Sequence, residues 1–188
     1  MQVIQVRGCN ASGKTTCVNG AIKHYGMVLE DYFTDGKNVM ITASPDKRII
    51  VLGRYDKKIG GCDLYGSTKE VVKTIVNVIK QFKPDTIIFE GMIYSKSMLF
   101  AENMRQICKN YGYKYKNIYL YRTWDSTIEL LDKRSGGGYS KTNLMATHKT
   151  CISVYQKMKK AIFDIKKVDV DNLSYEETQN ILLGIIDE

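Results

Sequence analysis

Apolar residues recur along this chain in two kinds of segment that alternate with each other. One kind is short: residues 3–6 form an apolar run with one polar interruption at Gln5, and the run at 86–89 is typical of a strand buried on both faces of a parallel sheet. The other kind has helical spacing, as in the segment that opens with the capping-box pattern Ser67-x-x-Glu70. The apolar positions of that segment are Val71, Val72, Ile75, Val76 and Ile79.

Proline and glycine residues indicate where turns and loops separate the predicted strands and helices. Ser44-Pro45-Asp46-Lys47 predicts a tight turn between strands at 39–42 and 49–52. The run 135–138 contains successive glycines, each of which costs about 1 kcal/mol in a helix, so a loop is predicted there. The remaining predicted elements are strands at 117–121 and 168–170 and helices at 16–25, 97–111, 141–165, after Thr123 and after Ser174.

Strands that alternate with helices in this way predict an α/β fold, in which helices cover both faces of a parallel sheet. A length of 188 residues fits one domain, with a small lid over about residues 133–145. Ligands of such sheets bind at the carboxyl ends of the strands. We therefore expect the chemistry of this protein in the loops that follow the strands.

A phosphate-binding loop lies between the first predicted strand and the first predicted helix. The sequence Gly8-Cys9-Asn10-Ala11-Ser12-Gly13-Lys14-Thr15 matches G-x-x-x-x-G-K-[ST], and Thr16 follows it. Backbone N–H groups of such a loop surround phosphates, and the positive end of the next helix adds attraction. Lys14 can reach the β- and γ-phosphates, and the Thr15 hydroxyl can bind Mg²⁺. We predict that residues 8–16 bind ATP with Mg²⁺, in a P-loop NTPase fold like that of nucleotide kinases.

Glu90 ends the predicted strand at 86–89 and is followed by Gly91. A carboxylate at this place typically reaches the Mg²⁺ directly or through water. We predict that Glu90 serves the metal site together with Thr15. The alternative is a strand-end acid that pairs with a surface cation.

The segment from Gly53 to Asp63 is rich in glycine and ends in an acid. A kinase that acts on an alcohol needs a carboxylate within hydrogen-bond reach of the attacking hydroxyl, and Asp63 is the candidate base. Arg54 can hold an acceptor phosphate, Tyr55 can stack on a base, and the glycine pair ending at Gly61 can let the chain turn under a substrate. The alternative is a surface loop without these roles.

Three cations flank the helix that precedes the glycine run: Arg122, Lys133 and Arg134. Kinases of this fold close a cationic lid over the phosphates, which stabilises charge in the transition state. Arg134 is the candidate catalytic cation, because the glycines after it permit closure; ordinary surface cations are the alternative. His24 and His148 lack ligand-like spacing, so both are expected to be plain surface or helix residues.

Net charge is +8, and the basic residues are concentrated in the second half. Residues 133–167 hold nine Lys or Arg against one acid, and residues 168–188 hold six acids and no base. This pattern indicates either a solvated helix face with lid cations or a surface for a polyanion such as DNA.

The five cysteines lack a C-x-x-C pair, which indicates reduced thiols in a cytoplasmic protein. No run of about 18 apolar residues and no signal-peptide pattern is present in the sequence, so no membrane contact is expected.

Several motifs together resemble one family. They are residues 7–16, Val51-Leu52-Gly53-Arg54-Tyr55, Gly60-Gly61-Cys62-Asp63 and Phe89-Glu90-Gly91. Their order and spacing, over residues 1 to about 135, are similar to those of the bacteriophage P-loop kinases that phosphorylate 5-hydroxymethyluracil in DNA. The resemblance implies ATP- and Mg²⁺-dependent transfer to the hydroxymethyl group, as a step in thymine hypermodification, with DNA containing this base as partner.

The resemblance also implies roles for individual residues. Lys14 and Thr15 would hold the nucleotide and the metal, and Asp63 and Glu90 would lie at the reacting end. The family often has His where this chain has Arg54. Which of the two acids is the base is left open by the sequence.

Other functions also stay open at this point. A kinase of free nucleosides or nucleotides would use the same fold, and a polynucleotide 5′-end kinase is a close variant. A free substrate needs no extended basic surface. An NTP-dependent binding or switch protein would transfer no phosphate, and its affinity for a partner would depend on the nucleotide.

Overall fold

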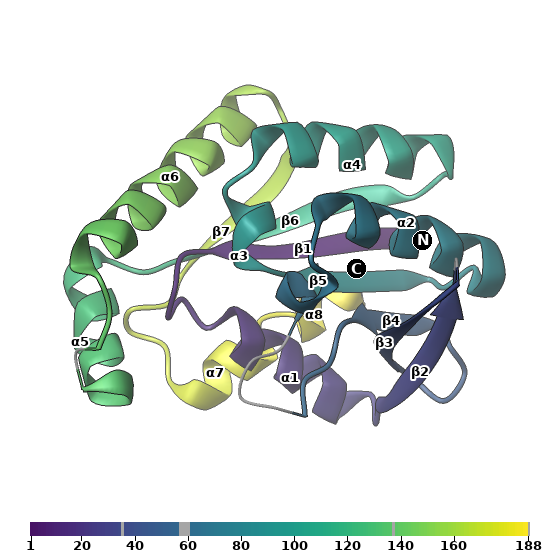
Figure 1. The fold of residues 1–188 in the computed structure, drawn as a ribbon, viewed down its shortest axis with the longest axis horizontal. Helices are drawn as coiled ribbons and strands as arrows, with labels where there is room; N and C mark the ends of the chain where they lie inside the picture. The colour runs from purple at the N-terminus through teal and green to yellow at the C-terminus, as the bar shows by residue number, and fades with distance from the viewer. Residues whose placement is uncertain (35, 57–60, 137, 188) are drawn as a thin grey trace.

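A computed structural model describes residues 1–34, 36–56, 61–136 and 138–187, which form one seven-stranded sheet between two layers of helices (Figure 1). The strands are β1 (Gln2–Gly8), β2 (Val28–Thr34), β3 (Lys37–Ala43), β4 (Ile49–Leu52), β5 (Thr86–Glu90), β6 (Lys114–Tyr121) and β7 (Asp164–Asp169). The helices are α1 (Lys14–His24), the 3₁₀ turn η1 (Cys62–Tyr65), α2 (Thr68–Phe82), α3 (Met92–Ser95), α4 (Met98–Asn110), α5 (Trp124–Ser135), α6 (Lys141–Lys160), α7 (Tyr175–Asn180) and α8 (Leu183–Ile186). None of these described helices is long and apolar enough to cross a membrane.

The strand order is β2-β3-β4-β5-β1-β6-β7, and the strands from β4 to β7 in this order run parallel. β2 and β3 form an antiparallel hairpin that extends the sheet beyond β4. β1 lies in the middle, where Val6 is level with Glu90 of β5 and Gly8 is level with Leu120 of β6. The chain leaves β1 toward β4 and β5 and later crosses to β6 on the other side. The carboxyl end of β1 is therefore the place where a ligand is expected.

Neighbouring residues of the central strands face two different cores. Val3 and Ile87 belong to the core under α2 and α4, whereas Ile4 and Ile88 belong to the core under α1. All of these side chains are fully buried. A strand that is covered on both faces needs apolar residues at every position, which explains the continuous run in β5.

The helix after the phosphate loop packs closely on the C-terminal part of the chain. A Cβ on Gly20 of α1 would lie 2.0 Å from the backbone O of Gln179 in α7. Only glycine permits this approach, because the obstructing atom belongs to the backbone. The contact fixes the orientation of α1, and α1 begins with the last residues of the phosphate loop.

Most predicted elements are confirmed, and three differ from the prediction. The edge strand β2 has no predicted counterpart, since two acids in its middle interrupt any apolar pattern. The helix predicted at 141–165 ends at Lys160, because the chain turns at Ile162 with φ of 54° and β7 starts at Asp164. The predicted closing helix is divided into α7 and α8.

Both predicted capping boxes mark helix starts, but only one of them forms both of its reciprocal hydrogen bonds. At α7, Ser174 Oγ accepts from the Glu177 N–H, and the Glu177 carboxylate accepts from the Ser174 N–H. At α2, Ser67 Oγ accepts from the Glu70 N–H, whereas the Glu70 carboxylate pairs with Lys37 of β3 at 3.2 Å. This ion pair connects the start of α2 to the hairpin.

Candidate active site

The phosphate loop joins the end of β1 to the start of α1 at the carboxyl edge of the sheet. Gly8 has φ of 148°, and a Cβ there would lie 2.4 Å from Ser12 Oγ and 2.6 Å from the Leu120 backbone O. Gly13 (φ 87°) and Ala11 (φ 55°) also have left-handed conformations. These conformations bend the loop into a concave turn whose N–H groups suit phosphate oxygens.

Lys14 lies folded over this loop. Its Nζ donates hydrogen bonds to the backbone O atoms of Gly8 (3.2 Å) and Cys9 (2.8 Å). The residue is only 8% exposed. The fold thus holds an ammonium group at the place where the β- and γ-phosphates of a bound nucleotide would lie.

Two side chains of the loop point into the protein. Cys9 packs with Tyr119 and Cys151, and burial raises the pKa of its thiol. Ser12 is fully buried, and its Oγ has no hydrogen-bond partner among the described residues. Cys9 and Ser12 can therefore serve a nucleotide only through their backbone.

A cleft of about 590 Å³ opens beside the loop. From the loop it is lined by Asn10, Ala11, Ser12, Gly13, Lys14, Thr15 and Thr16. The other walls are Asn19 of α1, Asp63 of η1, Glu90 of β5, Met92 of α3, and Leu131 and Arg134 of α5. All residues that are predicted to be catalytic thus share one cleft, although they come from different elements.

Thr15 and Glu90 meet inside this cleft. The Thr15 hydroxyl donates a hydrogen bond of 2.9 Å to Glu90 Oε1. Glu90 is 3% exposed, and burial raises the pKa of its carboxyl; the nearby charge of Asp63 acts in the same direction. Lys14 and the Thr15 hydroxyl partly oppose this shift. A hydroxyl and a carboxylate are hard oxygen donors, so the pair fits a Mg²⁺ ion that takes its other ligands from water and phosphates.

Gly61 makes room for the Glu90 carboxylate. Its φ is 78°, and a Cβ at this position would lie 2.6 Å from Glu90 Oε1. The next residue, Cys62, donates from Sγ to the Leu52 backbone O at 3.6 Å, and its own backbone O accepts from the Tyr94 hydroxyl at 3.0 Å. The motifs at 52–55, 61–63 and 89–91 are therefore in contact, and two of their residues, Asp63 and Glu90, line the cleft.

Asp63 lies at the edge of the cleft and holds the start of α3. Both of its carboxylate oxygens accept from the Met92 N–H, at 3.1 Å each. Gly91 permits this approach, since a Cβ there would lie 2.9 Å from Asp63 Oδ1 and 2.5 Å from the Tyr94 ring. Asp63 is exposed, and a carboxylate has enough lone pairs to accept a further hydrogen bond from a hydroxyl in the cleft.

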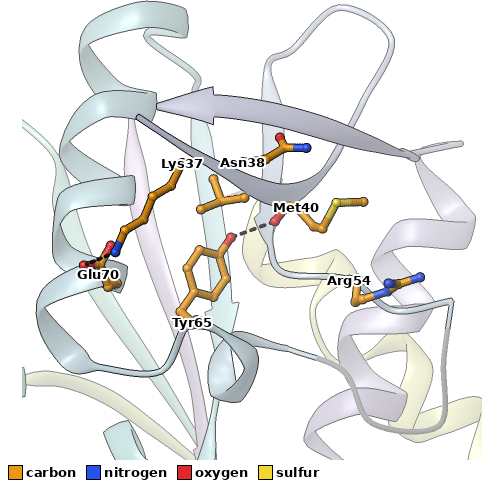
Figure 2. Close-up of a pocket in the computed structure, with 7 residues that line it drawn as sticks. Lys37, Asn38, Met40, Arg54, Tyr65 and Glu70 are labelled. Carbon is orange, nitrogen blue, oxygen red and sulfur yellow. Dashed lines mark hydrogen bonds and ion pairs between the residues drawn. The ribbon is translucent and has the colours of Figure 1, made fainter. Parts of the chain in front are cut away.

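Arg54 and Tyr55 do not line the cleft. Arg54 borders a separate pocket of about 270 Å³ and lies on the opposite side of it from Lys37 (Figure 2). Its guanidinium pairs with Asp56 at 2.5 to 2.7 Å. Tyr55 packs against the core under α1, and its hydroxyl is buried without a hydrogen-bond partner among the described residues, so burial raises its pKa. Their contacts with an acceptor stay a prediction, and Gly60 lies outside the described residues.

Of the predicted lid cations, only Arg134 lines the cleft. Arg122 instead pairs with Asp171 at 3.6 Å, beyond the end of β7. Lys133 pairs with Glu129 at 2.6 Å, one turn earlier on α5. Arg134 is exposed and takes part in no ion pair within the described ranges, so its charge is available to a ligand in the cleft.

The chain after α5 differs in detail from the predicted loop. α5 continues to Ser135, Gly136 ends it with φ of 60°, and Gly137 lies outside the described residues. His148 is a helix residue, as predicted, but it is buried, with Nε2 2.9 Å from the Arg122 backbone O. It therefore helps to fix α6 against the end of β6.

Three residues of the cleft have no predicted role: Asn19, Met92 and Leu131. Asn19 lies one turn beyond Thr15 in α1, so helical spacing from the loop is a signal that would have found it. Met92 follows the Glu-Gly pair directly, and its N–H is the donor to Asp63. Leu131 carries no such signal, because an apolar residue on a helix usually indicates core packing.

No family model matches the chain. A curated relative, the 5-hmdU DNA kinase of Pseudomonas phage M6, is 30% identical over 102 residues, which cover 50% of this chain and 54% of the relative. The chain thus spans about half the length of the curated relative that it matches. The similarity agrees with the family that the motifs resemble.

Two solved structures share the fold over most of the chain. The crystal structure of the YorR protein of Bacillus subtilis, in complex with phosphorylated GDP, has a TM-score of 0.58 at 12% identity and covers 99% of this chain and 96% of that chain. A structure of the PezAT chromosomal toxin-antitoxin system of Streptococcus pneumoniae has a TM-score of 0.51 at 14% identity and covers 92% of this chain and 70% of that chain. At such identities the likeness concerns the fold alone. The predicted α/β P-loop NTPase fold is confirmed.

Proposed function

We propose that this chain, which combines a P-loop fold with motifs like those of a phage 5-hmdU DNA kinase, is an ATP-dependent kinase that phosphorylates 5-hydroxymethyluracil in DNA. The observation that carries the proposal is the convergence of Asp63, Glu90 and the phosphate loop on one cleft. Phosphoryl transfer to an alcohol needs a phosphate site, a metal site and a carboxylate near the acceptor, and the cleft offers all of these. Similarity to the phage kinase supports the choice of acceptor.

ATP would lie on residues 8–16, with its terminal phosphates beside the Lys14 ammonium. Thr15 and Glu90 would hold Mg²⁺, which would offset the negative charge of the terminal phosphates. The start of α1 adds the positive end of its dipole to the same place. These groups position the γ-phosphate toward the side of the cleft that Asp63 borders.

The transfer is a substitution at the γ-phosphorus. The hydroxymethyl oxygen of the base attacks in line, the bond to the β,γ-bridging oxygen breaks, and ADP leaves. Asp63 accepts the hydroxyl proton, while Lys14 and Arg134 balance the charge on the transferred group. We assign the base to Asp63 because Glu90 is buried and bonded to Thr15, whereas Asp63 is exposed at the edge of the cleft.

DNA would reach the site with the target base turned out of the helical stack, beside Asp63. α6 offers a surface for the phosphate backbone, because it carries lysines and no acid. The exposed lysines are Lys141, Lys149, Lys157, Lys159 and Lys160. Binding that depends on them should weaken as salt rises. The phosphate placed on the base would act as a leaving group for a later reaction, which is the role expected in thymine hypermodification.

The experiment uses ATP labelled at the γ-phosphate with several acceptors. These are DNA containing 5-hydroxymethyluracil, matched thymine DNA, free nucleosides and monophosphates, and the products are digested and identified by mass. We expect label on internal 5-hydroxymethyluracil, lost in Lys14→Ala and much reduced in Asp63→Asn. Label on a free nucleotide or a strand end would instead indicate the corresponding other kinase. Absence of transfer to every acceptor would favour a nucleotide-dependent binding or switch protein.

A further inference from the structure

A groove of about 480 Å³ runs between α2 and α4. Its floor is apolar: Phe100 is 4% exposed, and Val72 and Ile107 are partly buried against the core. Leu99 also lines the groove, yet it is 68% exposed. An apolar floor with an exposed apolar side chain suits the flat face of a nucleobase.

The groove is positively charged on its α2 side. Lys69 and Lys73 line it, and both are exposed. Within the described ranges neither forms an ion pair, since the adjacent Glu70 pairs with Lys37 of β3. No Asp or Glu among the described residues lines the groove. Lys69 lies in the first turn of α2, where a positive charge opposes the helix dipole, so the charge does not stabilise the helix itself.

The groove begins beside the acceptor end of the candidate active site and shares no lining residue with it. η1, which carries Asp63, leads directly into α2, and α3, which begins at Met92, leads directly into α4 (Figure 1). The hydrogen bonds between Asp63 and Met92 tie these two connections together. A ligand whose reactive group lies at Asp63 therefore has the groove next to it.

We propose that this groove binds the DNA strand that flanks the acceptor nucleotide. The inference rests on the proposed function, in which the acceptor base belongs to DNA. Phosphates of the strand lie at Lys69 and Lys73, and unstacked bases lie on the apolar floor against Leu99. The turned-out acceptor base leaves its neighbours partly unstacked, and the groove covers the faces that this exposes.

The size and the polar groups of the groove fit this occupant. From Ser97 to Ile107 its α4 side is roughly 15 Å long, at 1.5 Å per helical residue, which accommodates a few nucleotides. Asn103 and Gln106 on the same side offer amide groups to base edges. Lys69 and Lys73 have no ion-pair partner, and no acid lines the groove, among the described residues, which favours a polyanion over a neutral peptide.

The test compares two double variants of the full chain. Lys69→Ala/Lys73→Ala removes both groove lysines, and Lys80→Ala/Lys109→Ala removes the same charge from the far ends of the same helices. The acceptors are a single-stranded oligonucleotide with one internal 5-hydroxymethyluracil and the free 5-hydroxymethyluracil deoxynucleotide.

We expect the groove variant to raise KM for the oligonucleotide about tenfold or more, with little change in kcat and none in KM for the free nucleotide. The dependence of log K on log salt for oligonucleotide binding should become shallower by about 1.4, because each phosphate contact in a single strand contributes about 0.7. The control variant should behave like the wild type. Leu99→Asp, at an exposed position that the fold does not need, should cause the same selective loss by adding a negative charge.

Two results would overturn the inference, and they can be told apart. If the wild type phosphorylates the oligonucleotide but the groove variant matches the control variant, the groove does not bind the strand, and the proposed function stands. If the wild type phosphorylates only the free nucleotide, the DNA acceptor is wrong, and the inference fails with it.

Discussion

The Thr15 hydroxyl donates a hydrogen bond of 2.9 Å to the carboxylate of Glu90, 75 residues further along the chain. The register of the sheet causes this contact, because β1 and β5 pair in parallel and place Val6 level with Glu90. Thr15 lies just beyond the loop that follows β1. Pairing of the two strands therefore brings together the two residues of the proposed metal site, so we expect a change at Glu90 to alter both stability and activity.

Glu90→Gln should stabilise the free protein at neutral pH while it abolishes metal-dependent activity. Burial raises the pKa of Glu90 above its ordinary value of 4.5, so the ionised form destabilises the fold. This loss of folding stability is absent below pH 4.5 and grows as pH rises through the folded-state pKa of Glu90. Glutamine does not ionise, so the variant does not lose stability in this way. Urea unfolding without metal or nucleotide should show equal midpoints for variant and wild type at pH 4 and a higher midpoint for the variant at pH 8. A midpoint that falls at pH 8 would contradict the assignment.

Asp63→Asn and Asp63→Ala should separate the two roles of this residue. Asparagine can still accept the Met92 N–H bond, so Asp63→Asn should keep the wild-type melting temperature and lose about 10² to 10⁴ in kcat, as expected when a general base is removed. Asp63→Ala should lose the same activity and, in addition, about 1 kcal/mol of stability, because α3 loses the group that holds its first N–H. Thermal unfolding and initial rates measure both effects. An Asp63→Asn variant with wild-type activity would show that another group acts as the general base.

Arg134→Ala should lower kcat by about 10² or more, because Arg134 lines the cleft and is the proposed lid cation. Lys133→Ala is the matched control, since Lys133 is the neighbouring residue and pairs with Glu129 outside the cleft lining. Its exposed ion pair is worth at most about 1 kcal/mol, so little change is expected in either rate or stability. Equal rates for the two variants would remove Arg134 from the catalytic set.

The parts of this site that the sequence predicts are those encoded by contiguous residues or by strand ends. The phosphate loop needs only its own residues and the helix that follows. Asp63 and Glu90 could be placed at the same edge because parallel strands carry their carboxyl ends to one side of a sheet. The close approach of Glu90 to Gly61, 29 residues earlier in the chain, needs a residue without a Cβ, which glycine provides.

The orientation of individual side chains could not be predicted in this way. Arg54 and Tyr55 are adjacent in sequence, yet Arg54 borders a pocket beside β3, whereas Tyr55 packs under α1. The direction of each is decided by residues that are distant in sequence. The role of Arg122 was equally hard to predict. Its partner Asp171 follows β7, and the two residues meet only because β6 and β7 pair in the folded sheet. Charge alone therefore does not distinguish a lid cation from a structural one.

Gly20→Ala should destabilise the protein by about 1 to 3 kcal/mol, because the added methyl group would collide with the Gln179 backbone O at 2.0 Å. Gly184→Ala is the control in the helix α8, where a Cβ meets no atom within 4 Å. There the same change should stabilise the protein by about 0.5 to 1 kcal/mol. Urea unfolding gives both values. Equal effects at the two positions would show that α1 and α7 do not pack as described.

Lys149→Gln/Lys157→Gln/Lys160→Gln should weaken DNA binding and leave the reaction with a free nucleotide unchanged. These residues lie on the exposed side of α6, which has no acid to pair with them. Each lost contact to a duplex phosphate should reduce the slope of log K against log salt concentration by about 0.9. Loss of all three contacts should therefore reduce the slope by up to about 2.7. A triple variant with the same charge change at Lys23, Lys80 and Lys109 serves as control. Binding by titration at several salt concentrations gives the slope. A slope that stays at the wild-type value would assign the lysines of α6 to solvation of an exposed helix, and DNA would have to be held elsewhere, first of all at the groove between α2 and α4.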